Sequence, residues 1–166
     1  MHILVKNNFL NYKNYKVKCA LGKKGINYKK KEGDLITPIG LFNIKYLLYR
    51  QDKIANFQTE LKKIPIKKNM GWCNDPKSKQ YNKLIKLPSN HSYEKLHKKN
   101  NIYDIILVID YNMNPIVKNK GSAIFVHIAK KNYKKTEGCI AIKKKEILKL
   151  LKIIKKNTKI KILNQK

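Results

Sequence analysis

Alternating apolar and polar positions run through the N-terminal third of the chain and predict short β-strands separated by turns. Residues 2–5 and 15–21 are expected to pair as a hairpin across the Asn-, Tyr- and Lys-rich segment between them. Residues 22–33 are polar and contain glycines, which predicts a loop, and residues 40–47 regain strand character. This part of the chain therefore favours a β-rich fold.

The middle of the chain is polar and irregular, whereas two later segments are apolar at consecutive positions. Residues 51–100 contain prolines that break any long element, namely Pro65, Pro76 and Pro88. By contrast, residues 104–110 and 123–128 have the unbroken hydrophobicity that is typical of central strands covered on both faces. We therefore expect a sheet whose middle strands are buried on both sides.

The C-terminal part of the chain has the clearest helical periodicity. Residues 143–157 place apolar side chains on one broad stripe, formed by Ile147, Leu148, Leu150, Leu151 and Ile154. This pattern predicts one long amphipathic helix, and the alternation over residues 159–163 predicts a final strand. Since no internal repeat or linker is visible, we expect residues 1–166 to form one domain of the mainly β or α+β class.

Composition excludes several classes of protein. The 166 residues are 42% hydrophobic, which excludes a disordered polyelectrolyte despite a formal net charge of +29. The longest apolar run, residues 105–109, is far shorter than the roughly 20 residues that cross a bilayer. No apolar signal segment is visible at the N-terminus, so the sequence leaves the cytoplasm open as a location.

The positive charge is spread along the whole chain and favours no particular partner. Among its 39 basic residues, Arg50 is the single arginine, although specific recognition of bases and phosphates favours the arginine fork. Dispersed lysines attract polyanions non-specifically at low salt, whether nucleic acid or an acidic cell wall. The charge therefore predicts association and not a defined nucleic-acid site.

Three cysteines stand far apart, and one of them differs from the others in context. Cys19 and Cys73 lie in apolar surroundings and are expected to be small buried hydrophobic residues. No CxxC pair is present, and His91 and His97 lack a third ligand at metal spacing, so no metal site is predicted. Cys139 follows a glycine in a polar segment, which is unusual for a core position.

The candidate chemistry is concentrated between residues 121 and 142. His127 lies near the end of a buried strand, and a polar loop then leads back to Gly138 and Cys139. Such a return can bring the imidazole to the thiol and activate it as a nucleophile, with nearby backbone N–H groups as an oxyanion hole. Taken alone, the spacing is equally compatible with a core histidine beside a buried cysteine.

Several motifs in order resemble the L,D-transpeptidase catalytic domain family (YkuD-type). His127 followed by Thr136–Cys139 is similar to the family signature, a strand histidine and a Ser/Thr-x-Gly-Cys turn. Residues 31–42 resemble its EGD-x-x-TP-x-G-x-F segment. Further stretches resemble one branch of the family: Gly71–Pro76, Tyr81-Asn82, Tyr103-Asp104, Tyr111-Asn112, Pro115 and Gly121–Phe125. The resemblance implies a single β-sandwich-type domain.

The resemblance also implies a mechanism. Cys139 would attack a peptidoglycan stem tetrapeptide at the bond to its terminal D-Ala, and His127 would accept the thiol proton, with the Cys139 pKa lowered by this pairing. Gly138 would help to form the oxyanion hole, and Thr136 would position the turn. No metal or organic cofactor is expected. Action on peptidoglycan implies the cell envelope or periplasm, and no expectation arises for oligomeric state.

The same resemblance suggests substrate contacts and two departures. Asp75, Tyr81 and Asn82 are candidate substrate-binding residues, and Trp72 is expected either in the core or lining the cleft. Glu137 and Ala141 stand where many members have His and Arg or Asn, respectively, which bears on acceptor choice and carboxylate recognition.

Two acidic residues are expected to have structural roles, and the predicted function has two alternatives. Glu32 and Asp34 are expected to form turn hydrogen bonds. The predicted function is that of a peptidoglycan L,D-transpeptidase. The alternatives are an L,D-carboxypeptidase, in which water replaces the amine, and a non-catalytic domain that binds cell wall or polyanions.

Overall fold

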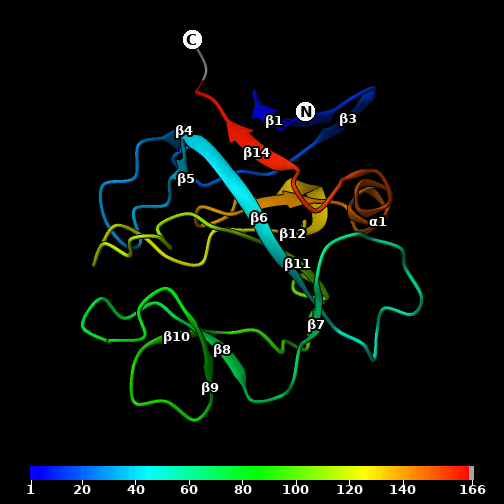
Figure 1. The fold of residues 1–166 in the computed structure, drawn as a ribbon. Helices are drawn as coiled ribbons and strands as arrows, with labels where there is room; N and C mark the ends of the chain where they lie inside the picture. Colours follow the sequence, from blue (N-terminus) through cyan, green and yellow to red (C-terminus); the bar gives the residue numbers. More distant parts are fainter. Residues whose placement is uncertain (165–166) are drawn as a thin grey trace.

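The computed structural model describes residues 1–164 as a mainly β structure with a short C-terminal helix (Figure 1). Besides the helix α1 (Lys144–Ile153) and the 3-10 turn η1 (Lys131–Tyr133), the described residues form fourteen strands. These strands are β1 (Ile3–Lys6), β2 (Phe9–Tyr12), β3 (Tyr15–Lys18), β4 (Ile26–Asn27), β5 (Thr37–Pro38), β6 (Gly40–Tyr49), β7 (Lys63–Pro65), β8 (Met70–Cys73), β9 (Leu84–Lys86), β10 (Tyr93–Lys95), β11 (Ile105–Ile109), β12 (Phe125–Ile128), β13 (Ile140–Ile142) and β14 (Lys159–Ile162).

Most strands belong to one nine-stranded sheet that nearly closes on itself. Its order is β13-β12-β11-β6-β14-β1-β2-β3, with β7 added beside β6. The chain that leaves β3 then returns to the opposite edge, where Ala20 and Ala141 exchange backbone hydrogen bonds of 2.8 and 2.9 Å. The same returning segment bonds to Thr136, whose N–H donates to the Leu21 carbonyl. This closure fixes the turn that precedes β13.

The central strands β11 and β12 are covered on both faces, as their unbroken hydrophobicity predicted. One face packs under α1 and the N-terminal strands and includes Leu107, Val126 and Leu150. The opposite face includes Ile106 and Phe125 and packs against residues of the β8–β10 region. Alternate residues of β11 and β12 therefore face two different cores.

A three-stranded sheet, ordered β10-β8-β9, lies apart from the N-terminal strands and covers the second face (Figure 1). Its register pairs Trp72 with Leu84 on one side and with Glu94 on the other. Residues 51–100 are therefore less irregular than the sequence indicated. Their strands are only three or four residues long, which leaves little alternation to detect.

The N-terminal strands form a three-stranded meander and not the expected direct hairpin. β2 occupies the segment that was predicted as a turn, and it pairs with β1 on one side and β3 on the other. Leu10 and Tyr12 of β2 are buried. Asn7 and Asn8 have positive φ angles of 54° and 59°, so the tight turn lies between β1 and β2. Because β2 contains Asn and Tyr, the segment was predicted as a turn and not as a strand.

The helix is shorter than the sequence predicted. α1 has ten residues and buries Ile147, Leu150 and Leu151, so the apolar stripe is real but not long. At Ile154 the backbone becomes extended, with φ −78° and ψ 150°. The Thr158 hydroxyl then accepts a 2.8 Å hydrogen bond from the Lys155 N–H, which stabilises a turn into β14. Within residues 1–164, no helix has the length and hydrophobicity to cross a membrane.

Candidate active site

Neighbouring parallel strands bring Cys139 and His127 to the same face of the sheet. The register of β12 and β13 pairs His127 with Ala141, so Cys139 comes directly before β13 beside Phe125. Cys139 packs against the core of Phe125, whereas Ile140 belongs to the core under α1. Because side chains alternate along a strand, His127 and Cys139 both face the β8–β10 region.

His127 is held as a neutral base with its orientation fixed. Its ring is buried, with 6% of its surface exposed, and Nδ1 lies 3.0 Å from the carbonyl oxygen of Ile128. A carbonyl only accepts, so Nδ1 carries the proton and Nε2 has the free lone pair. Burial lowers the pKa of His127 to about 4. The imidazole is therefore uncharged near neutral pH.

The Cys139 thiol is also neutral, contrary to the predicted low pKa. The pKa of Cys139 is raised to about 12, mainly by burial and secondarily by the charges of Glu94 and Glu137, whereas a hydrogen bond from the Phe125 backbone and the charge of Lys29 lower it. Sγ donates a 3.2 Å hydrogen bond to the Ala123 carbonyl, and no His127–Cys139 hydrogen bond occurs within residues 1–164. The pair thus rests as thiol and imidazole, so the proton must move during attack.

The turn before Cys139 is built on Thr136 and Gly138. The Thr136 hydroxyl donates to the Cys139 carbonyl at 2.6 Å and accepts from the Gly138 N–H at 3.2 Å. Gly138 has φ +142°, and a Cβ there would lie 2.9 Å from the Ile36 carbonyl oxygen. The position therefore requires glycine. The Cys139 N–H has no acceptor among the described residues, which leaves a donor beside the nucleophile.

Tyr103 packs against His127 and lines the same cavity as Cys139. Its ring contacts both Phe125 and His127 edge-to-face, with centroid distances of 6.2 and 5.3 Å. Burial raises the pKa of Tyr103 well above its ordinary value, and the negative charges of Glu94 and Glu137 add to the effect. Tyr103 therefore stays a neutral phenol that shields the pair from water.

A cavity of about 100 Å³ opens at Cys139. Its lining residues come from the 29–33 loop, the β8–β10 region, the residue Tyr103 before β11, the segment directly before β12 and the turn before β13: Lys29, Glu32, Gly33, Asn74, Glu94, Tyr103, Ser122, Ala123, Ile124, Glu137, Gly138 and Cys139. Gly138 and Cys139 thus form one wall of a concave site, as a nucleophile and an oxyanion donor require.

The comparison with protein families agrees with this geometry. The model of the family YkuD, L,D-transpeptidase catalytic domain, matches residues 2–162, nearly the whole chain. The chain belongs to this family. Its members are cysteine-dependent enzymes of the L,D-transpeptidase type that act on peptidoglycan stem peptides. A search of curated proteins found no match.

Within this L,D-transpeptidase domain, Lys29 and Asp34 form a buried ion pair at the edge of the cavity. Their side chains are 3% and 6% exposed, and Lys29 Nζ donates to Asp34 at 2.5 Å and to the Ile36 carbonyl at 3.2 Å. Burial alone would raise the pKa of Asp34, but the hydrogen bonds from Lys29 and from backbone N–H groups lower it. Asp34 therefore shapes its own turn, as predicted.

Three of the four candidate substrate-binding residues are buried in a hydrogen-bonded network. Asn82 accepts from Trp72 Nε1 at 2.9 Å and from the Ala123 N–H at 3.1 Å. The Tyr81 hydroxyl donates to Glu32 and accepts from the Gly121 N–H at 2.9 Å. Since Trp72, Tyr81 and Asn82 expose at most 2% of their surface, this structure assigns them a positioning role behind the cavity.

Asp75, the fourth candidate, lies outside the cavity wall. It accepts hydrogen bonds from the Lys77 N–H at 2.9 Å and pairs with His91 at 2.9 Å. The hydrogen bonds from Lys77 and His91 lower the pKa of Asp75. A direct role for Asp75 in substrate binding stays a prediction.

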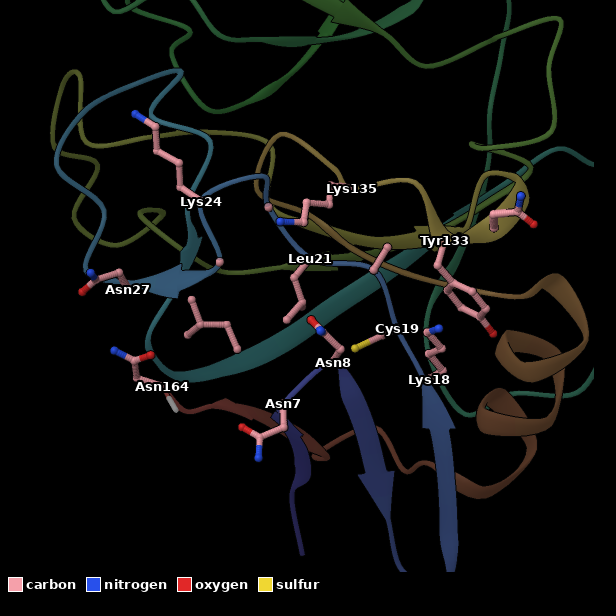
Figure 2. A pocket seen from close by; sticks show the side chains of 15 residues that line it. Asn7, Asn8, Lys18, Cys19, Leu21, Lys24, Asn27, Tyr133, Lys135 and Asn164 are labelled. Atoms are coloured by element: carbon pink, nitrogen blue, oxygen red, sulfur yellow. The ribbon is translucent and has the colours of Figure 1, made fainter. Parts of the chain in front are cut away.

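A larger pocket of about 540 Å³ is lined by the segment that follows β3, around Cys19 and Leu21 (Figure 2). Figure 2 shows asparagine amides and lysines around it, with the Cys19 sulfur near its centre. Burial raises the pKa of Cys19 to about 12, and Cys19 has no histidine beside it in this lining. Positive φ angles explain Asn7, Asn8 and Asn132 as turn residues. Size alone therefore does not make this pocket the catalytic one.

Sequence reasoning missed the roles of Tyr103, Ser122 and Glu94 in the cavity. Tyr103 and Ser122 lie in stretches that carried the family resemblance, but nothing in their local context indicates a cavity wall. Glu94 belongs to β10, a strand that the sequence did not predict. Pairing β10 with β8 is what brings Glu94 to the site.

Proposed function

We propose that the protein is a peptidoglycan L,D-transpeptidase that transfers an acyl group from a stem tetrapeptide to an amine and releases the terminal D-Ala. The carrying observation is the arrangement of His127 on the same face as Cys139: its Nδ1 is bound to the Ile128 carbonyl, and its Nε2 has no hydrogen-bond partner within residues 1–164. A fixed neutral base on the same face as a partly buried thiol fits nucleophilic acyl transfer. Family membership supports the substrate class.

The neutral resting pair favours proton transfer during the attack over a preformed thiolate. As the Cys139 sulfur bonds to the scissile carbonyl carbon, its proton passes to His127 Nε2. The imidazolium then gives that proton to the leaving D-Ala nitrogen as the C–N bond breaks. This step leaves a thioester at Cys139 and a neutral imidazole again.

The second half of the reaction reverses these roles. An acceptor amine attacks the thioester carbon, its extra proton passes to His127, and the C–S bond breaks. The released sulfur recovers the proton from the imidazolium, so the enzyme returns to its starting state. In both halves the Cys139 N–H, which is free among the described residues, is placed to donate to the oxyanion.

The Gly138 N–H is a less available donor, although it was predicted to share this role. In the resting structure it donates to the Thr136 hydroxyl at 3.2 Å. That bond is long for an N–H···O contact, so an oxyanion that carries full charge competes for the donor effectively. Thr136 thus holds the donor in place until the tetrahedral intermediate forms.

Peptidoglycan lies in the cell envelope, so this proposal implies that the protein acts there. The dispersed positive charge, +29 over the chain, would attract the protein to an acidic wall surface. Such attraction would concentrate the enzyme near its substrate without contributing to the chemistry at Cys139.

Mass spectrometry of disaccharide-tetrapeptide fragments tests the proposal. Wild-type protein should release D-Ala, show a transient acyl-enzyme mass on Cys139 and form crosslinked dimers. Cys139→Ala should do none of these. Cys19→Ala is the matched control, because it removes a thiol that does not line the cavity at Cys139.

The products separate the remaining alternatives. Tripeptide without dimers identifies an L,D-carboxypeptidase, since water then accepts the acyl group. No D-Ala release from a panel of stem peptides, together with wall binding that weakens steeply with salt, overturns the catalytic proposal in favour of a polyanion-binding domain.

A further inference from the structure

The cavity at Cys139 has the opposite charge character to the rest of the protein. The chain has 39 basic and 10 acidic residues, yet three glutamates line this cavity: Glu32, Glu94 and Glu137. Lys29 is the one basic residue in the lining, and Asp34 and the Ile36 carbonyl already engage its ammonium group. Composition therefore does not account for the carboxylates in this cavity.

The three carboxylates differ in how they are engaged. Glu32 accepts a hydrogen bond from Tyr81 and serves the network behind the cavity. Glu94 pairs with Lys98 at 2.5 Å, where both side chains remain partly exposed. Glu137 has no ion-pair or hydrogen-bond partner within residues 1–164 and lies directly beside Gly138 in the catalytic turn. Glu137 therefore offers an open negative charge at the nucleophile.

A second observation points to a missing hydrogen-bond donor. Ser122 is 7% exposed, its Oγ has no hydrogen-bond partner among the described residues, and Ser122 lines the same cavity. An unsatisfied buried hydroxyl is costly, and a ligand that donates to it removes this cost. Carboxylates and a hydroxyl oxygen together are the acceptors that an ammonium group, with its three N–H donors, requires.

The negative charges of the cavity also oppose formation of the thiolate. Burial is the main cause of the raised pKa of Cys139, and Glu94 and Glu137 add to it, whereas a hydrogen bond from the Phe125 backbone and the charge of Lys29 lower it. The thiolate is the nucleophilic form of a cysteine, and two nearby carboxylates disfavour it. A positive group bound between them would offset this repulsion and favour loss of the thiol proton.

We infer that Glu137, Glu94 and Ser122 form a recognition site for a primary ammonium group of the substrate, next to Cys139. This inference rests on the proposed function and adds the residues that bind the positively charged group of the substrate. Glu137 supplies the open charge, Glu94 a second carboxylate and Ser122 a buried acceptor. The site makes the positive charge of the substrate part of the activation of the thiol.

The ammonium group can come from either of two substrate parts. It can belong to the side chain of the residue that donates the acyl group, or to the acceptor amine before that amine loses a proton to His127. Both present the same chemistry to Glu137, and the experiment has separate arms for the two sources.

The first arm measures binding without turnover. Cys139→Ser protein is titrated by NMR with Nα-acetyl-L-lysyl-D-alanine, its Nε-acetylated form and Nα-acetyl-L-norleucyl-D-alanine. The lysyl peptide should bind about tenfold more tightly than either neutral peptide, as a charge-assisted hydrogen bond provides. Adding Glu137→Gln should remove most of this preference, and Ser122→Ala should reduce it.

Glu60→Gln is the matched control for charge. It also removes one carboxylate from the chain, but Glu60 pairs with Lys155 at 2.6 Å near the end of α1 and does not line the cavity. The preference for the lysyl peptide should therefore survive in Glu60→Gln. An equal loss in Glu60→Gln and Glu137→Gln would show that only the overall charge matters and would overturn the inference.

The second arm tests the acceptor with wild-type and Glu137→Gln proteins. Neutral Nα-acetyl-L-norleucyl-D-alanine is the donor and Nα-acetyl-L-lysine amide is the acceptor. If the site holds the acceptor, Glu137→Gln lowers the ratio of aminolysis to hydrolysis about tenfold and leaves donor affinity unchanged. A charge preference in one arm identifies the source, and no preference in either arm overturns the inference.

The outcomes keep this inference separate from the proposed function. Charge-selective binding by Cys139→Ser without any turnover by wild-type protein would support the ammonium site and contradict the transpeptidase proposal. Turnover of lysyl and norleucyl peptides at equal rates and affinities, with an unchanged aminolysis ratio in Glu137→Gln, would do the reverse.

Discussion

The two faces of the central sheet use the same strands for different purposes. The face under α1 packs Leu107, Val126 and Leu150 in a wholly hydrophobic cluster. The opposite face of the same strands carries His127 and meets Tyr103, with Cys139 beside them. Because successive residues of a strand point to opposite faces, adjacent positions separate stability from chemistry. The comparison teaches that the candidate pair, His127 and Cys139, lies on strands whose other face is packed in an apolar core.

Replacing the base should give the largest functional effect of any change on the polar face. His127→Gln removes the free Nε2 that accepts the Cys139 proton, so D-Ala release should fall about a thousandfold. The free energy of unfolding at pH 7 should change far less. His2→Gln, which alters an exposed histidine, should keep wild-type turnover. Near-normal turnover in His127→Gln would remove the distinction between the two faces.

Replacing a residue of the apolar face should have the converse effect. Leu150→Ala leaves a cavity between α1 and the sheet and should lower the free energy of unfolding by about 2–5 kcal/mol in urea titrations. The turnover number of the folded fraction should stay within about twofold. Lys149→Ala, at an exposed position of the same helix, should leave stability nearly unchanged.

The sequence was sufficient to predict this support and to single out His127 and Cys139 as candidates, whose catalytic roles stay a prediction. Unbroken hydrophobicity predicted strands covered on both faces, which β11 and β12 confirm. The spacing of His127 and Cys139, together with the family motifs, identified residues that the fold brings to one face. The hydrophobicity is a local signal. His127 and Cys139 lie in, or directly before, two strands that are neighbours in the sheet.

The rest of the site depends on contacts between segments far apart in the chain. Tyr81 donates to Glu32 and Asn82 accepts from Ala123, pairings separated by 49 and 41 positions. No local pattern shows that these polar side chains would be buried behind the cavity. The low Cys139 pKa was predicted from His127 alone, and burial and the neighbouring carboxylates reverse it.

Acid should lower the free energy of unfolding through His127, a residue of the polar face. Burial lowers the pKa of His127 from 6.5 to about 4, so the unfolded chain binds a proton that the folded protein excludes. Stability is therefore retained above pH 6.5 and falls as the pH drops toward 4. Between pH 7 and 4.5 this histidine should account for a loss of about 2 kcal/mol.

Urea titrations of wild-type and His127→Gln protein at both pH values isolate this contribution. The variant should lose about 2 kcal/mol less than wild type on acidification, because it lacks the group that titrates. Asp34 does not obscure the result, since its pKa is lowered below 3.8 and its contribution is lost at a lower pH. An identical acid response in the two proteins would mean that His127 is not buried as a neutral base.

The smallest effect is expected where the two faces meet, at the turn that carries Cys139 from the polar face into β13. Thr136→Val removes the hydroxyl that bonds to the Cys139 carbonyl and the Gly138 N–H, and should lower the free energy of unfolding by about 1 kcal/mol. D-Ala release should fall about tenfold, because the oxyanion donors lose their support. Thr136→Ser keeps the hydroxyl and should restore turnover. A loss of stability without a loss of turnover in Thr136→Val would mean that this turn only supports the fold, like the apolar face. The expected loss of both would show that the Thr136 hydroxyl contributes to stability and to turnover at once.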